Sequence, residues 1–399
     1  MTTKRDEWAR SWPLPLIAML GITGPAAYAY TGGIFMGEMT REFGWTKTEF
    51  STAMTLQMVI GLIVGPVAAR VLDRIGSRRM LLAGVVPFAL GLAMLSLATG
   101  AVWQWWMLAA LYALTHFGVG SASWINGVVQ SFDAARGMAI AVCLTGIGLA
   151  TVGWPLIAAE LVEAFGWRMA YPAMASIWLV IILPLVFLYY RPVPRKDAAH
   201  GGPVPPIGPA VKTRTFWFLV CAGGLFSSVQ FGLIVHLFPT VRLQGLDMTT
   251  AASMVSITGV FSILGRLGTG ALLDRMPTKP LAIFAFLLPL VVMGLFATAD
   301  GSLPMLMAAS ALLGFAAGSE IDVVAYLCSR RFDQRIFGTV YTLFQMTFAV
   351  SSSVGPLLAS WQFDSSGSYL GYYAIAGTMI VSASILIAFL PPPPKAVTT

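Results

Sequence analysis

Long apolar runs separated by short polar loops form the dominant pattern along the chain. Each run holds roughly 20 residues, the length that an α-helix needs to cross the hydrocarbon core of a bilayer. The pattern therefore predicts an all-α membrane protein with twelve transmembrane helices. The runs are residues 13–36, 51–71, 79–99, 104–128, 137–159, 169–190, 215–239, 250–273, 280–299, 303–327, 337–359 and 369–390.

A longer polar segment lies between the sixth and seventh runs. Its sequence, RPVPRKDAAHGGPVPPIGPAVKTR, is rich in Pro and Gly and is typical of a linker that forms no packed unit. We therefore expect a six-helix half at residues 1–190, a cytoplasmic linker at 191–214 and a second six-helix half at 215–399.

Three short matches between the two halves indicate an internal repeat, because the second copies all lie 200 or 201 residues after the first. Two parallel six-helix halves with a binding site between them are a known transporter plan. The matches are Arg41–Gly44 with Arg242–Gly245, Leu72–Arg74 with Leu273–Arg275, and Phe132–Asp133 with Phe332–Asp333.

The placement of Lys and Arg predicts the orientation of the helices. Most of the 24 Lys and Arg residues lie at the termini, in the linker and in loops that follow even-numbered runs. Such residues concentrate in cytoplasmic loops, so we expect both termini inside (N-in/C-in). This arrangement also explains the net charge of +7 without nucleic acid as a partner. Four residues would lie outside: Arg41, Lys47, Arg168 and Arg242.

Composition excludes a large soluble domain, because only 10% of the residues are charged and soluble domains have about 25%. The three cysteines, Cys143, Cys221 and Cys328, lie in separate apolar runs and suggest neither a metal site nor a disulfide framework. The chain has no nucleotide-binding glycine loop and no paired catalytic acids in a polar setting. We expect a protein that is not an enzyme and that needs no cofactor or metal.

One arginine, Arg266, lies within the apolar stretch SITGVFSILGRLGTGALLDRM, residues 256–276. An arginine at the centre of a membrane helix costs about 2.5–3.5 kcal/mol on insertion scales, and such residues face wet cavities or counter-charges. Its guanidinium group is permanently charged and its planar shape matches a carboxylate. The pattern predicts that Arg266 binds an anion.

Two acids, Glu320 and Asp322, also lie at membrane depth. Arg266 and Glu320 would lie about 12 and 15 Å from the same ends of their helices, so the two helices could pair. The acids are about 200° apart around their helix, so we expect only one of them to face the transport path. At least one is a candidate for proton coupling, and the alternative is a purely structural ion pair.

Further candidates come from polar and aromatic residues within the apolar runs. His116 could relay protons, or it could simply bond to a neighbouring helix, and His236 could belong to an outer gate. Six residues could line a substrate cavity, although membrane aromatic residues more often serve packing. The six are Tyr28, Tyr30, Trp124, Asn126, Gln230 and Gln345.

The segment GPVAARVLDRIGSRR, residues 65–79, is similar to the loop signature of the major facilitator superfamily. A second copy, GALLDRMPTK, spans residues 270–279. The resemblance implies the fold of that superfamily. We expect the acid–base pairs of the two copies to hold one conformation of the transporter. These pairs are Asp73 with Arg74 and Asp274 with Arg275.

Other stretches resemble the monocarboxylate-carrier and oxalate/formate-antiporter branch of the superfamily. They are EFGWTKTEFS (42–51), RGMAIAVCLTGIGLATVGWP (136–155), FGWRMAY (165–171) and the arginine of the eighth run. In that branch this arginine binds the substrate carboxylate, which implies that role for Arg266. The carboxylate that animal carriers place four residues earlier is Ser262 here, and their first-helix lysine is Tyr30. A single cation favours a monocarboxylate over a dicarboxylate.

These observations predict a secondary transporter that carries a small organic monocarboxylate with a proton by alternating access. The alternatives are an organic anion exchanger without proton coupling, a carrier of aromatic or longer-chain acids, and a substrate sensor that does not transport. The expected partners are the organic acid, protons and the lipid bilayer. We expect a monomer in the inner (plasma) membrane of a bacterium.

Overall fold

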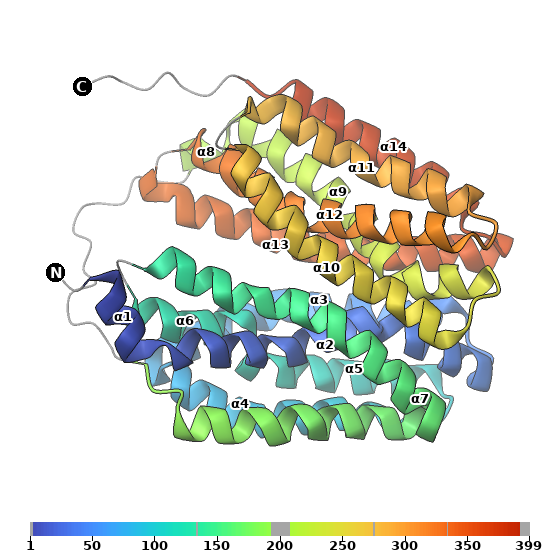
Figure 1. Ribbon diagram of the computed structural model, residues 1–399, viewed down its shortest axis with the longest axis horizontal. Helices are drawn as coiled ribbons and strands as arrows, with labels where there is room; N and C mark the ends of the chain where they lie inside the picture. Colours follow the sequence, from blue (N-terminus) through green and yellow to red (C-terminus); the bar gives the residue numbers. More distant parts are fainter. Residues whose placement is uncertain (1–2, 133–134, 193–207, 274–275, 333, 392–399) are drawn as a thin grey trace. The chain divides into compact units, whose positions relative to one another are not determined.

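The computed structural model describes residues 3–132, 135–192, 208–273, 276–332 and 334–391, and these residues are helical almost throughout (Figure 1). All twelve predicted runs lie on helical segments, and the prediction of an all-α membrane protein is confirmed. The first helices are α1 (Lys4–Ser11), α2 (Pro13–Phe43), α3 (Lys47–Ile75), α4 (Ser77–Met94), α5 (Val102–His116), α6 (Ser121–Ser131) and α7 (Arg136–Leu188). They are followed by α8 (Gly208–Val211), α9 (Arg214–Leu243), α10 (Met248–Leu273), α11 (Thr278–Thr298), α12 (Leu303–Ser329), α13 (Gln334–Ser366) and α14 (Leu370–Ala388). Two 3₁₀ turns are η1 (Leu95–Leu97) and η2 (Phe117–Val119).

Within these described ranges, nine helices are long and apolar enough to cross a membrane. One of them is α7, which contains two of the predicted runs. It has two limbs, residues 136–165 and 167–188, because Gly166 has non-helical backbone angles (φ 76°, ψ 162°) that a residue with a Cβ rarely adopts. Helices α2 and α13 are not among the nine. In α2, prolines, glycines and threonines lower the mean hydropathy.

The predicted run 104–128 is interrupted where α5 ends and η2 begins. At this point Gly118 packs directly on Gly84 of α4, and a Cβ atom at position 118 would lie 2.5 Å from the Cα of Gly84. The indole nitrogen of Trp124 in α6 donates to the carbonyl of Val119 at 2.7 Å. This bond satisfies a carbonyl group at the break, as a buried backbone group requires.

The chain divides into two compact units. The first comprises Met1–Ala199 together with Met248–Ser256, and the second comprises His200–Asp247 and Ile257–Thr399. In the first unit α7 packs on α2 and α4, and α3 packs on α5. In the second unit α9 packs on α13 and α14, and α11 packs on α12 and α14 (Figure 1).

The N-terminal helix α1 is attached to the start of α7. Its own first turn has a capping box, in which Thr3 and Asp6 exchange hydrogen bonds between side chain and backbone. The carboxylate of Glu7 accepts a hydrogen bond from the backbone nitrogen of Ala135 at 3.0 Å. This nitrogen is one of the donors that a helix N-terminus leaves without an intrahelical partner. The ring of Trp8 packs edge-on against Phe132 with centroids 5.2 Å apart.

Two stretches that carry the family resemblance meet at one end of the first unit. Glu42 accepts hydrogen bonds from the indole of Trp167 at 2.5 Å and from Arg168 at 2.9 Å. Arg168 also donates to the carbonyl of Ala98 at 2.7 Å and lies over the Trp167 ring at 4.4 Å. These contacts connect the end of α2 to the second limb of α7. We refer to Glu42, Trp167 and Arg168 as the Glu42 cluster.

Candidate functional site

Within the second unit, residues 257–273 of α10 are in direct backbone contact with α12, and this contact positions the predicted site residues. A Cβ atom at Gly318 of α12 would lie 2.0 Å from the carbonyl oxygen of Ser262 and 2.8 Å from the backbone nitrogen of Arg266. A Cβ atom at Gly265 of α10 would lie 2.4 Å from the carbonyl oxygen of Phe315. Only glycine fits at such distances, so these residues allow the two backbones to touch.

Hydrogen bonds from side-chain hydroxyls fix the alignment of α10 and α12 on both sides of the glycine contacts. The hydroxyl of Thr258 donates to the carbonyl of Ser310 at 3.2 Å. Near the other end, the hydroxyls of Thr269 and Ser319 are 2.7 Å apart. The helix that carries Arg266 and the helix that carries the two acids therefore form a close pair over several turns.

Arg266 and Glu320 lie on the two helices of this pair, and Glu320 contacts a third helix. Arg266 is half-buried on α10, beside Gly318. Glu320 is 6% exposed, and its carboxylate accepts a hydrogen bond from the hydroxyl of Ser227 in α9. Positions 318 and 320 are about 200° apart around α12, so Gly318 faces α10 and Glu320 faces α9. The side chain of Asp322 lies outside the described part of the chain, so its role stays a prediction.

Gln230 extends the polar contact between α9 and α12. It lies three residues after Ser227, on the same face of α9. Its side-chain nitrogen donates to the carbonyl of Leu313 at 2.9 Å, and its side-chain oxygen has no partner among the described residues. Ser227, which the sequence analysis did not select, is thus the residue that meets Glu320. The three-residue spacing between Ser227 and Gln230 places both on one face of the helix and could have indicated Ser227 from the sequence.

His236 connects three helices at the other end of α9. It is 2% exposed. One ring nitrogen, Nε2, lies 3.0 Å from the carbonyl of Pro356 and 3.1 Å from the hydroxyl of Ser360, both in α13. The other, Nδ1, lies 2.8 Å from the hydroxyl of Tyr369 before α14. Because a carbonyl only accepts, we assign the proton to Nε2, and Nδ1 can accept from Tyr369.

Tyr28 and His116 belong to one aromatic cluster inside the first unit. Tyr28 is 4% exposed and its ring lies 5.1 Å from that of Tyr112 in α5. His116 lies one turn after Tyr112, with ring centroids 6.5 Å apart. The hydroxyls of Tyr28 and Tyr112 have no hydrogen-bond partner among the described residues. Phe88 of α4 contacts both Tyr112 and His116 and completes the cluster.

The other predicted cavity residues lie in different surroundings. Trp124 is fully buried, and a Cβ atom at Gly21 of α2 would lie 2.4 Å from its ring. Asn126 accepts a hydrogen bond from Gln130 one turn later in α6. Tyr30 is half-buried and Gln345 is exposed.

In the signature segment at residues 65–79, Arg78 bonds to another helix, although it was not among the predicted residues. Asp73 and Arg74 are exposed in the last turn of α3. Arg78 instead donates to the carbonyl of Phe187 at 2.9 Å, near the C-terminus of α7. A cation is favourable there because the last carbonyls of a helix carry partial negative charge. The other predicted pair, Asp274 and Arg275, lies outside the described residues.

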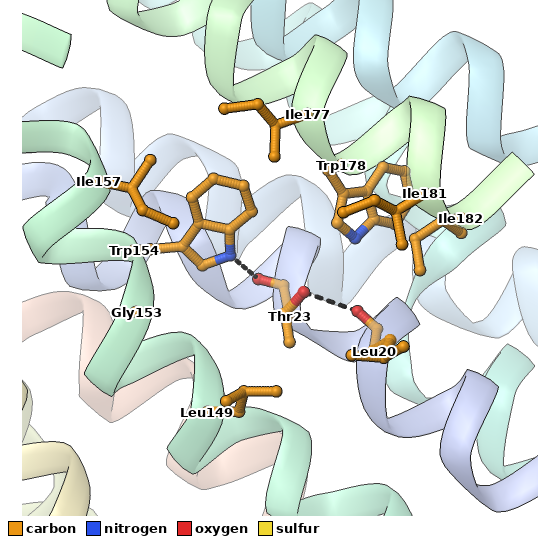
Figure 2. A pocket seen from close by; sticks show the side chains of 10 residues that line it. All are labelled: Leu20, Thr23, Leu149, Gly153, Trp154, Ile157, Ile177, Trp178, Ile181 and Ile182. Atoms are coloured by element: carbon orange, nitrogen blue, oxygen red, sulfur yellow. Dashed lines mark hydrogen bonds between the residues drawn. The ribbon is translucent and has the colours of Figure 1, made fainter.

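A groove in the first unit is separate from all of these residues. It lies between α2 and the two limbs of α7 and has about 210 Å³ of open volume. Figure 2 shows its lining, which includes Thr23 of α2, Trp154 of the first limb and Trp178 of the second limb. None of the predicted site residues contributes to the lining.

Family comparison gives the fold a name. The sequence model of the Major Facilitator Superfamily matches residues 16–302 and 279–399. The chain belongs to the Major Facilitator Superfamily. It is therefore a transporter of that superfamily and a multi-pass integral membrane protein, as its apolar helices indicate.

Relatives and a solved structure agree with this assignment. Monocarboxylate transporter 13 of Rattus norvegicus is 24% identical over 366 residues, covering 90% of this chain and 84% of the relative. Monocarboxylate transporter 11 of Homo sapiens is 25% identical over 399 residues, covering 93% and 82%. A bacterial homolog of the human lysosomal transporter Spinster, in an inward-facing and unoccupied conformation, matches with a TM-score of 0.71. It is 14% identical and covers 98% of this chain and 95% of that chain, so it supports the fold alone.

Proposed function

We propose that this protein carries small organic monocarboxylate anions together with protons, and that Arg266 binds the substrate carboxylate. The observation that carries the proposal is the contact between α10 and α12. It brings a permanent cation and a buried carboxyl group onto adjacent helices of one unit. The names of the relatives support the substrate class, because they are monocarboxylate transporters.

Arg266 and Glu320 have complementary chemistry for the joint transport of an anion and a proton. A guanidinium group stays charged at every physiological pH, so Arg266 offers a constant site for an anion. A carboxyl group can be neutral or charged, so Glu320 can take up a proton and release it. The Ser227 hydroxyl can donate to the charged form and holds the carboxylate in place. Binding of an anion and a proton to the same helix pair would couple their transport by alternating access.

The test is uptake by purified protein in proteoliposomes. Labelled lactate, pyruvate, acetate, benzoate and oxalate are offered with and without an inward proton gradient. We expect the gradient to stimulate uptake of at least one monocarboxylate. Arg266→Ala should reduce that uptake at least tenfold, because a hydrogen bond to a charged group contributes about 1.5–3 kcal/mol. Glu320→Gln should remove the stimulation by the gradient.

Arg242→Ala is the matched control, because this arginine is exposed at the end of α9 in the same unit. It should transport like the unchanged protein. Normal uptake by Arg266→Ala would show that the proposed binding residue is wrong. Uptake that needs only internal anion and ignores the proton gradient would indicate anion exchange and would leave Glu320 with a structural role.

A further inference from the structure

The groove in the first unit opens on the side of a membrane-spanning helix. Most of its lining comes from the two limbs of α7, which is among the helices long and apolar enough to cross a bilayer. Leu149 and Ile157 on the first limb are 41% and 37% exposed, and Ile177 and Ile181 on the second limb are 38% and 49% exposed. The groove therefore has an open apolar rim at membrane depth.

The polar atoms of the groove are already used or closed. The indole nitrogen of Trp154 donates to the carbonyl of Thr23 at 3.0 Å, and the Thr23 hydroxyl donates to the carbonyl of Leu20 at 2.6 Å (Figure 2). The indole nitrogen of Trp178 has no hydrogen-bond partner among the described residues, but it is buried against Gly24 of α2. A bound water needs two to four polar partners. The one unpaired donor among the described lining residues, the Trp178 indole, is buried, so the groove does not supply two partners and its natural occupant is apolar.

We propose that this groove binds one hydrocarbon chain of a bilayer lipid. The exposed branched side chains of the two limbs lie within apolar runs long enough to cross a bilayer, and they form walls along which a single extended acyl chain can lie. A helix of a second protein copy is about 10–12 Å across and does not enter a groove of about 210 Å³. The site is in the first unit and is independent of the proposed role of Arg266.

Photolabelling tests the proposal. Purified protein is placed in nanodiscs with phosphatidylcholine that carries a diazirine in one acyl chain, and labelled peptides are mapped by mass spectrometry. We expect labels on both limbs of α7 at the groove. A Cβ atom at Gly153 meets nothing within 4 Å, so Gly153→Leu fills the groove without a backbone clash. It should lower labelling of these peptides at least fivefold.

Gly294→Leu is the matched control, because Gly294 is an exposed glycine in α11 with open space around it. It should leave labelling at the groove unchanged. Ile181→Trp, which narrows the groove from the second limb, provides a second variant in case Gly153→Leu does not fold. Equal labelling in the filled variants would overturn the proposal. Cross-links between protein copies that Gly153→Leu removes would assign the groove to a second copy and would also overturn it.

Discussion

Individual side chains in this transporter differ mainly in whether their polar atoms have partners. His236 and Glu320 are almost fully buried and bond to neighbouring helices. The hydroxyls of Tyr28 and Tyr112 are equally buried, but they lack partners among the described residues. A buried polar atom without a partner costs about 1–3 kcal/mol, so this difference should be measurable in unfolding experiments.

Tyr112→Phe should raise the stability of the protein by about 1 kcal/mol, because it removes an unpaired hydroxyl and keeps the ring contacts with Tyr28 and Phe88. Tyr372→Phe is the matched comparison, because the hydroxyl of Tyr372 donates to the carbonyl of Val229 at 3.1 Å. It should lower stability by a similar amount. The midpoint of thermal unfolding in detergent measures both. A lower midpoint for Tyr112→Phe would mean that its hydroxyl does form a stabilising bond.

At the level of helices, close backbone contact decides which elements form the site. The glycines of α10 and α12 bring Arg266 and Glu320 onto one helix pair, and the bond from Ser227 adds α9. At one end of the first unit, the Glu42 cluster joins α2 to the second limb of α7 by a charge-assisted bond and an indole donor. We test the glycine contacts and the Glu42 cluster by separate predictions.

Gly318→Ala should strongly destabilise the second unit, since its new methyl group would lie 2.0 Å from the carbonyl oxygen of Ser262. We expect the loss to exceed about 2 kcal/mol, in the upper range for overpacking. Gly270→Ala on α10 is the control, because a Cβ atom there meets nothing within 4 Å. Alanine is favoured over glycine in an open helix position by about 0.5–1 kcal/mol, so this variant should be slightly more stable. Thermal unfolding of both variants checks the prediction, and similar midpoints would contradict it.

The Glu42 cluster should make stability depend on pH. The hydrogen bond from Trp167, and after it the bond and charge of Arg168, lower the pKa of Glu42 from its ordinary value. A lowered pKa stabilises the folded state at every pH above the ordinary value, and this contribution is lost as pH falls through the lowered pKa. The unfolding midpoint should therefore fall on acidification below about pH 4.5, near the ordinary pKa of a glutamate. In Glu42→Gln this part of the decline should be absent, and an unchanged pH profile would contradict the assignment.

The whole molecule consists of two compact units with related sequences. The repeat seen in the sequence has a structural counterpart, because Gly44 and Gly245 both have positive φ angles (69° and 85°) just after α2 and α9. Leu72 and Leu273 are both buried near the ends of α3 and α10. Membership of the Major Facilitator Superfamily agrees with this duplication.

Orientation in the membrane stays a prediction at this level, and cysteine labelling can test it. With Cys221, the exposed native cysteine, replaced by Ser, Lys212→Cys and Ser365→Cys each introduce one exposed cysteine. Because Lys and Arg concentrate in cytoplasmic loops, we expect an impermeant maleimide to reach position 365 from outside intact cells. Position 212 should react only after the cells are opened. The reverse pattern would overturn the N-in/C-in prediction.

The length of the apolar runs and the repeated loop segments were sufficient to predict helices, membrane insertion and family. These are local properties, because a helix must be long and apolar enough to satisfy its backbone in lipid whatever its neighbours are. The placement of Arg266 and Glu320 at similar depth followed from the same local geometry. The hydrogen-bond partner of Glu320 did not follow from local geometry. Ser227 lies 93 residues away in the sequence, and only the rotation and contact of α9 against α12 bring it to the carboxylate. The groove beside α7 likewise could be found only from the tertiary structure. Its walls come from three chain segments, and their apolar residues form no pattern in the sequence that distinguishes them from other membrane-helix residues.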